Sequence, residues 1–296
     1  ASLRRAEAFD PTEPATLAKA LLGFRYARLG PHDLPDRLAD LDRVDQLVSD
    51  RHDPESRVAS AMYRCEDLLR AHRLDGARAA LTEAARLLDR YPDPYWMWAA
   101  RTWDAVLHLA DGDLDRADAI SLDALERRRE VAEAHVCRAV NLVTIRLYQG
   151  RAGEVVDLLR GAADANTNIP AFHAVLALAA AEAGDTELAR QHLRWFADAG
   201  FRNLPHDTNR FLGLSALAHA AAAVDDAAAA STLVELLEPY DGQWVVLNCY
   251  GGGGASWGPV SHALGLLALT QGRTVTARSY LERAAAEAGP AAPDSR

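Results

Sequence analysis

The segments Gly112-Asp-Leu-Asp-Arg-Ala117, Gly150-Arg-Ala-Gly-Glu-Val155, Gly184-Asp-Thr-Glu-Leu-Ala189 and Gly272-Arg-Thr-Val-Thr-Ala277 are four copies of one pattern. In each copy a small apolar residue follows a glycine by five positions. Weaker copies end at Ala77 and Ala229, with His72 and Val224 in the place of the glycine. The glycine places recur at intervals of roughly 34 to 48 residues, which is the period of a helix–turn–helix repeat.

Each position of this pattern has a physical role. The glycine adopts the left-handed conformation that ends a helix. An aspartate directly after it, as at Asp113 and Asp185, caps the next helix and suits its positive N-terminus. Apolar residues then follow at helical spacing, as Ile120 and Ala124 follow Ala117. The sequence therefore predicts an all-α fold, a tetratricopeptide-like helical-repeat solenoid of about fourteen antiparallel helices between residues 14 and 288.

The length and composition fit one continuous repeat stack. The chain has 296 residues, of which 49% are hydrophobic, and this is ample to bury a core. We expect a single solenoid over residues 1–296, ordered from about 11 to 289 and flexible at both ends. No strand-rich domain is predicted, and Val245-Val246-Leu247 is the one β-branched run of note.

Charge and cysteine content restrict the partners and the compartment. The formal net charge is −10, and the longest basic run, Arg127 to Arg129, lies late in a predicted helix, where cations suit the helix dipole. Direct nucleic-acid binding is not expected, because such binding needs a basic surface. No apolar stretch is long enough to span a bilayer. Three widely spaced cysteines form no disulfide framework or zinc spacing, which favours a cytoplasmic location.

Several segments resemble the C-terminal repeat region of large actinobacterial ATP-binding regulators, the MalT-like, LuxR-type and adenylate-cyclase-associated proteins with a signal-transduction ATPase. The resemblance runs from about residue 30 onward. The segments that carry it are Asp36-Arg-Leu-Ala-Asp-Leu-Asp-Arg-Val-Asp-Gln-Leu, Gln149-Gly-Arg-Ala-Gly-Glu-Val-Val-Asp-Leu-Leu, Leu204-Pro-His-Asp-Thr-Asn-Arg-Phe, Leu236-Leu-Glu-Pro-Tyr and Trp257-Gly-Pro-Val-Ser-His-Ala-Leu-Gly.

The resemblance implies a sensory or scaffolding region of a transcriptional or signalling regulator. The chain departs from the pattern at His206 and Arg210, which replace the expected residues of a Leu-Pro-Arg-Asp-x-Asn-x-Leu motif. It also contains neither an ATPase nor a DNA-binding helix-turn-helix. The resemblance therefore points to transcription regulation or signal transduction through protein–protein interaction, not to the ATPase or the DNA reader.

The most unusual stretch is 239–258, which holds four consecutive glycines, Gly251 to Gly254. We expect residues 245–258 to fold back onto the last helices and close one end of the stack, because terminal repeats must hide an apolar flank. The alternative is a ligand or partner contact, since loops of this length are often functional. It contains neither a nucleotide-binding P-loop nor a dinucleotide fingerprint. The candidate contacts in it are Tyr250, Gly252, Gly253 and Trp257.

Two further groups have both a structural and a functional interpretation. Asp207 and Asn209 are expected to cap a helix, with a polar ligand contact as the alternative. The aromatic residues from Tyr91 to Trp103 are expected to be core, and an exposed subset would form an interaction hot spot.

No catalytic residue, metal site or cofactor is predicted. There is no His-Glu-x-x-His sequence, no Gly-x-Ser-x-Gly sequence and no cysteine with a neighbouring acid and histidine. The function expected is therefore non-catalytic: the concave face binds a protein or peptide partner or a small effector, as part of a cytoplasmic regulator. The alternative is a stand-alone tetratricopeptide adaptor or scaffold.

Overall fold

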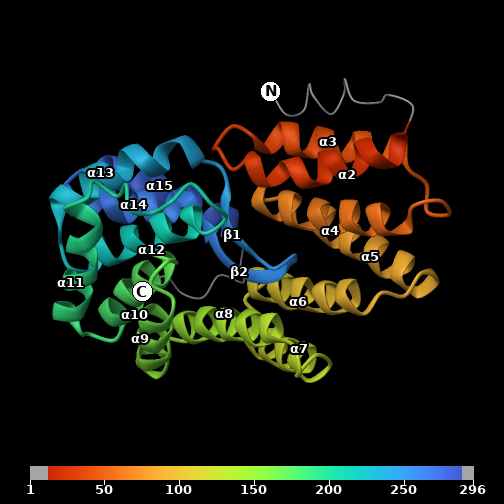
Figure 1. Cartoon of the computed structure of the whole chain (residues 1–296). Helices are drawn as coiled ribbons and strands as arrows, with labels where there is room; N and C mark the ends of the chain where they lie inside the picture. The colour runs from red at the N-terminus through yellow and green to blue at the C-terminus, as the bar shows by residue number, and fades with distance from the viewer. Residues whose placement is uncertain (1–12, 289–296) are drawn as a thin grey trace.

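The computed structural model describes residues 13–288, within which there are fourteen α-helices and one β-hairpin (Figure 1). The flexible ends predicted at residues 1–10 and 289–296 lie outside the described residues. The helices are α2 (Pro14–Phe24), α3 (Leu34–Leu47), α4 (Pro54–Arg70), α5 (Leu74–Arg90), α6 (Pro94–Ala110), α7 (Leu114–Glu126), α8 (Ala132–Tyr148), α9 (Val156–Ala165), α10 (Ala171–Glu182), α11 (Thr186–Ala197), α12 (Arg210–Ala223), α13 (Ala227–Leu237), α14 (Val260–Thr270) and α15 (Thr274–Ala288).

The turns between paired helices confirm the repeat pattern. Gly112, Gly150, Gly184 and Gly272 all have a left-handed backbone, with φ between 67° and 84°. A side chain would be strained in this conformation, so glycine stands there for a conformational reason. Asp113 follows the first of these glycines and accepts a hydrogen bond from the N–H of Arg116, capping α7; Asp185 caps α11 in the same way.

Two turns depart from the general pattern. At the fifth repeat the left-handed residue is Asp225, with φ of 56°, and not Val224. Asp226 then caps α13 by accepting from the N–H of Ala229, so the fully buried small residue in the repeat position is Ala230. An aspartate tolerates the left-handed region better than the β-branched valine does. After Gly150 no aspartate follows, and a 3-10 turn over Ala152–Glu154 delays the start of α9.

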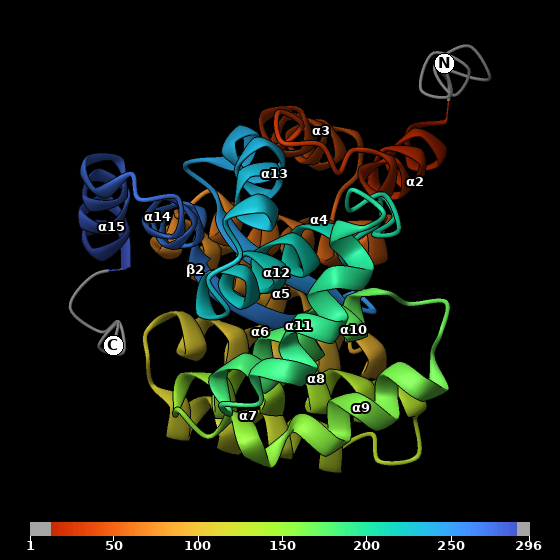
Figure 2. The same ribbon diagram turned by 90° about the vertical axis from the view of Figure 1, so that its left-hand side faces the viewer.

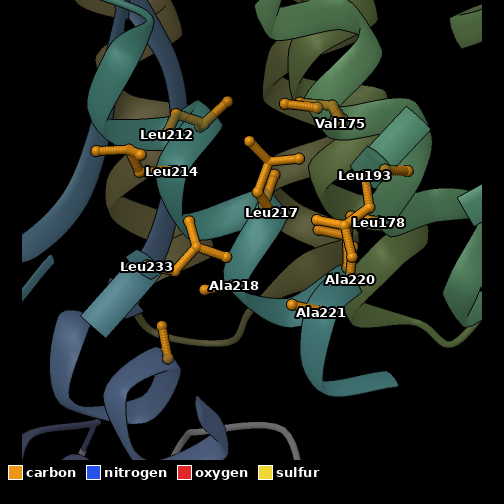
Figure 3. Close-up of a cluster of buried hydrophobic side chains, with 14 of the residues drawn as sticks. Val175, Leu178, Leu193, Leu212, Leu214, Leu217, Ala218, Ala220, Ala221 and Leu233 are labelled. Atoms are coloured by element: carbon orange, nitrogen blue, oxygen red, sulfur yellow. The ribbon is translucent and has the colours of Figure 1, made fainter. Parts of the chain in front are cut away.

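The helices form two groups with separate hydrophobic cores. Figure 1 shows the groups on either side of the hairpin, and Figure 2 views the molecule from the side of the left-hand group. Helices α2–α7 supply the first core, and α9–α14 supply the second, with α8 contributing to both. In the second core, alanines of α12 lie among larger aliphatic side chains such as Leu178, Leu217 and Leu233 (Figure 3). Small residues let helix axes approach closely, which explains how so alanine-rich a sequence packs tightly.

The stretch 239–258 is not an irregular loop over the last repeat, and that prediction was wrong. It contains strands β1 (Trp244–Cys249) and β2 (Gly252–Pro259), which pair antiparallel. The connecting residues Tyr250 and Gly251 both have positive φ, at 51° and 79°, as in the two-residue turns that suit twisted hairpins. The hairpin lies between the two helix groups, mainly against α6 and α8, and not at an end of the array (Figure 1).

The alternation of side chains along β1 explains why the hairpin lies between the two helix groups. Trp244 and Val246 belong to the first core, whereas Val245 and Leu247 belong to the second. Successive side chains of a strand point to opposite faces, so a strand whose first four residues are all apolar needs an apolar partner on both sides. The space between the two helix groups offers this environment, and a terminal flank offers only one apolar side.

Candidate functional site

A cleft of about 850 Å³ opens between the hairpin and helices α6, α8, α9, α10 and α12. Its wall is predominantly aliphatic, with Val140, Val143 and Leu159 on one side and Val175 and Leu212 on another. Six aromatic side chains also line it: Tyr26, Tyr95, Trp98, Phe172, Tyr250 and Trp257. A mostly apolar concave site of this size, with a few polar groups, is typical of small-molecule binding.

The polar side chains of the cleft are few and mostly neutral. Hydroxyl and amide groups come from Thr144, Asn166, Thr208, Asn209 and Asn248. The charged side chains among the lining residues are Arg128 and Glu133. The site is therefore suited to hold an apolar body and to orient it through a small number of hydrogen bonds.

The hairpin forms one wall of the cleft, and its glycines allow it to lie directly on α6. The N–H of Gly253 donates to Thr102 Oγ1 at 2.9 Å, and Trp103 Nε1 donates to the carbonyl of Gly251 at 3.1 Å. A Cβ on Gly253 would lie 2.7 Å from the carbonyl oxygen of Thr102 and 2.9 Å from Trp103 Cα. Only a residue without a side chain allows this approach.

Helix α8 also holds strand β2 of the hairpin. Asn141 Nδ2 donates to the carbonyl oxygens of Gly253 and Gly254, and the Tyr148 hydroxyl donates to the carbonyl of Ser256 at 2.9 Å. These bonds satisfy main-chain groups that a two-stranded sheet leaves unpaired. The hairpin is thus anchored by side chains of α6 and α8 and is a fixed wall of the cleft.

A buried ion cluster lies behind this wall, and the sequence reasoning missed it. Arg25 binds Glu66 and Asp67, each at 3.0 Å, and Arg37 binds the same two carboxylates. Burial raises the pKa of Glu66, but the guanidinium groups of Arg25 and Arg37 outweigh this effect and lower the pKa to about 2. No spacing in the sequence reveals this cluster, because Arg25 comes from a 3-10 turn, Arg37 from α3 and the carboxylates from α4.

Asn248 of β1 connects the cleft with the ion cluster. Its Nδ2 donates to Glu66 Oε2 at 2.7 Å, while its Oδ1 accepts from the N–H of Gly251 at 2.7 Å in the hairpin turn. Arg70 of α4 makes a second link to the hairpin, since its Nε donates to Oε1 of Gln243, the residue directly before β1, at 2.9 Å. The position of the hairpin is therefore tied to the N-terminal helices by charged and polar groups as well as by apolar packing.

The structure separates the predicted contact residues into two groups. Asn209, Tyr250 and Trp257 line the cleft, and Trp257 Nε1 also donates to Thr144 Oγ1 at 3.2 Å. Gly252 and Gly253 lie against α6 and do not line the cleft. Asp207 lines a separate cavity of about 30 Å³ beside the ion cluster.

The capping interpretation of residues 207–209 holds only in part. Asn209 stands directly before α12 but makes no side-chain bond to it. Asp207 instead accepts a hydrogen bond from the N–H of Asn209 at 2.9 Å, which orders the turn before the helix. The amide of Asn209 is thus free of a capping role at the edge of the cleft.

The aromatic residues of α6 confirm the core prediction and supply part of the site. Trp96, Trp98 and Trp103 are buried. Tyr95 is exposed over 37% of its surface, lines the cleft and donates its hydroxyl hydrogen to the carbonyl of Tyr250 at 2.7 Å. A single helix thus contributes to the first core, to the hairpin contact and to the cleft.

A scan against protein-family models finds no match to this chain, and a search of curated proteins finds none either. Among residues 13–288, no group of three or more metal-ligating side chains could hold a metal ion. The same part of the chain includes no helix that is both long and apolar enough to cross a membrane.

Cys137 of α8, which contacts the hairpin, is not disposed to act as a nucleophile. The thiol of Cys137 donates to the carbonyl oxygens of Cys249 and Gly253. The pKa of Cys137 is raised well above its usual value by its hydrogen bond with Cys249 and by burial. Because the thiolate is the reactive form, this side chain stays protonated and serves to hold the hairpin.

Proposed function

We propose that this chain is a non-catalytic, ligand-sensing helical-repeat region, and that the cleft beside the hairpin takes a small effector. The observation that carries the proposal is the cleft itself: about 850 Å³, lined by apolar and aromatic side chains and oriented by a few amides and hydroxyls. Sites of roughly 300 to 1,000 Å³ with this lining suit small molecules. A peptide or protein partner on the same concave face is the other possible occupant.

The cleft draws its wall from both helix groups, which gives an effector a way to act. Tyr95 and Trp98 come from the first group, Phe172 and Leu212 come from the second, and Tyr250 comes from the hairpin between them. A ligand that contacts both helix groups and the hairpin stabilises the arrangement in which these three parts lie together. In a cytoplasmic regulator of the kind that the sequence resembles, this shift would be passed to a neighbouring domain.

The test is binding of a neutral apolar probe. N-phenyl-1-naphthylamine becomes fluorescent on leaving water, and we expect saturable binding to the purified chain. Ala139→Trp should abolish this binding, because Ala139 lines the cleft on α8 and an indole there would fill it. The matched control is Ala132→Trp, on the same helix but exposed and outside the cleft. Equal binding by both variants would remove the cleft from the proposal.

A separate test concerns the regulator. If the chain belongs to such a protein, its gene should encode a nucleotide-binding Walker sequence upstream of the repeats. A reading frame that encodes the repeats alone would favour the stand-alone adaptor. This result would leave the ligand-binding proposal unchanged, because the cleft lies wholly within the repeats.

A further inference from the structure

We propose that the effector of this cleft is a small amphipathic organic acid, whose anionic group binds at the corner formed by Arg128 and Trp98 while its apolar body lies between α8 and α10. This inference rests on the proposed function and specifies the chemistry of the ligand. It is carried by two side chains that line the same cleft and have hydrogen-bond donors to spare.

Arg128 is the first of these side chains. It is half-buried, follows α7, and places its guanidinium carbon 5.9 Å from the centre of the Tyr95 ring and 5.7 Å from that of Trp98. It forms no ion pair with any carboxylate of residues 13–288, whereas its neighbours Arg127 and Arg129 are paired to Asp123 and Glu126. The aromatic rings hold the cation in place, and its N–H groups remain for a partner.

Trp98 is the second. Its side chain is 3% exposed, and its indole N–H has no hydrogen-bond partner among the described residues. The same is not true of Trp103 on the next turns of α6, whose N–H binds the carbonyl of Gly251. A buried donor without an acceptor is unfavourable, and a ligand oxygen would satisfy it. The Arg128 guanidinium carbon lies 5.7 Å from the centre of the ring that carries this N–H, and together the two favour an acceptor that carries negative charge.

The rest of the lining determines the remainder of the ligand. The carboxylate that lines the cleft, Glu133, is exposed to water, which screens its repulsion of an anion. The walls beyond Arg128 are aliphatic and aromatic, including Val140, Leu159 and Phe172. They bury an apolar body favourably and offer few partners to a sugar or a nucleotide. The chain has a net charge of −10, so Arg128 is what makes this position attractive to an anion.

Two probes that share one body test the inference. N-phenyl-1-naphthylamine is neutral, and 1-anilinonaphthalene-8-sulfonate adds an anionic sulfonate to the same rings. We expect the sulfonate probe to bind the wild-type chain about tenfold more tightly than the neutral probe, the effect of one partly screened charge-assisted hydrogen bond. Arg128→Gln should remove this preference, so that the two probes bind with about equal affinity, and should leave the affinity of the neutral probe unchanged. Arg129→Gln, at the next position along the chain and exposed, is the matched control and should change neither affinity.

The outcomes separate the two proposals. If both probes bind equally and Arg128→Gln changes neither, the organic-acid proposal is overturned while the cleft remains a ligand site. If neither probe responds to Ala139→Trp, the cleft proposal fails. Trp98→Phe keeps an aromatic ring and removes the N–H, so it should weaken the sulfonate probe alone. An equal loss for both probes would show that Trp98 only shapes the wall, and would overturn its part in holding the anion.

Discussion

Gly253→Ala is the substitution that most directly tests how the hairpin is held. It adds one methyl group to β2 where the strand lies on α6. The new carbon would be 2.7 Å from the carbonyl oxygen of Thr102, 2.8 Å from Val106 Cγ2 and 2.9 Å from Trp103 Cα. Two of these three atoms belong to helix backbone and cannot rotate away, so the strand has to move.

The magnitude follows from what this movement disturbs. Forcing an extra carbon into a packed site costs about 1–3 kcal/mol. The shift also lengthens the bonds from Gly253 N–H to Thr102 Oγ1 and from Asn141 Nδ2 to the Gly253 carbonyl. Each such bond contributes about 0.5–1.5 kcal/mol. We therefore expect Gly253→Ala to lower the free energy of unfolding by about 3 kcal/mol, a large part of the stability of an ordinary domain.

Urea denaturation followed by circular dichroism at 222 nm measures this change. The matched control is Gly161→Ala, because Gly161 lies within α9 and a Cβ there meets no atom within 4 Å. It should raise stability by about 0.5–1 kcal/mol, the advantage of alanine over glycine in a helix. A midpoint for Gly253→Ala equal to that of the wild type would refute the docking of the hairpin on α6.

Three further predictions concern a packed tryptophan, a buried histidine and the net charge. Trp257→Ala should lower the free energy of unfolding by about 2–3 kcal/mol, because the ring is half-buried and hydrogen-bonded to Thr144. It should also weaken binding of the neutral probe, and an unchanged melting temperature would contradict the packing of the ring. Burial, with the nearby His262, lowers the pKa of His219 to about 3, so the unfolded chain takes up a proton below about pH 6.5 and the folded chain does not. Stability should therefore fall as the pH drops from about 6.5, by about 2 kcal/mol at pH 5, and His219→Gln should remove this part of the slope in denaturant titrations. The chain should not bind duplex DNA near physiological salt, since its net charge is −10, and a sub-micromolar, salt-sensitive mobility shift would contradict this.

The cleft could be anticipated only in part from the sequence. Tyr250, Trp257 and Asn209 were candidates because they stand in unusual stretches, and the structure places all three at the cleft. Arg128 appeared to be one of three arginines at the end of a helix, and Trp98 appeared to be an ordinary core residue. Their importance depends on which of them lack a partner, and this depends on contacts between α6, α7 and the hairpin that no local pattern encodes.

The sequence by itself determined the repeat. Glycine at a left-handed turn and aspartate at a helix start act through their own backbone and the next few residues, so Gly112 with Asp113 and Gly184 with Asp185 are readable without any tertiary information. Only the tertiary structure decided what became of residues 244–259. Their glycines and apolar run lack a helical period, and they form a hairpin because two separate cores face it and α6 and α8 supply its missing hydrogen bonds. These partners lie more than 100 residues away along the chain, so no local pattern of the sequence encodes the contacts.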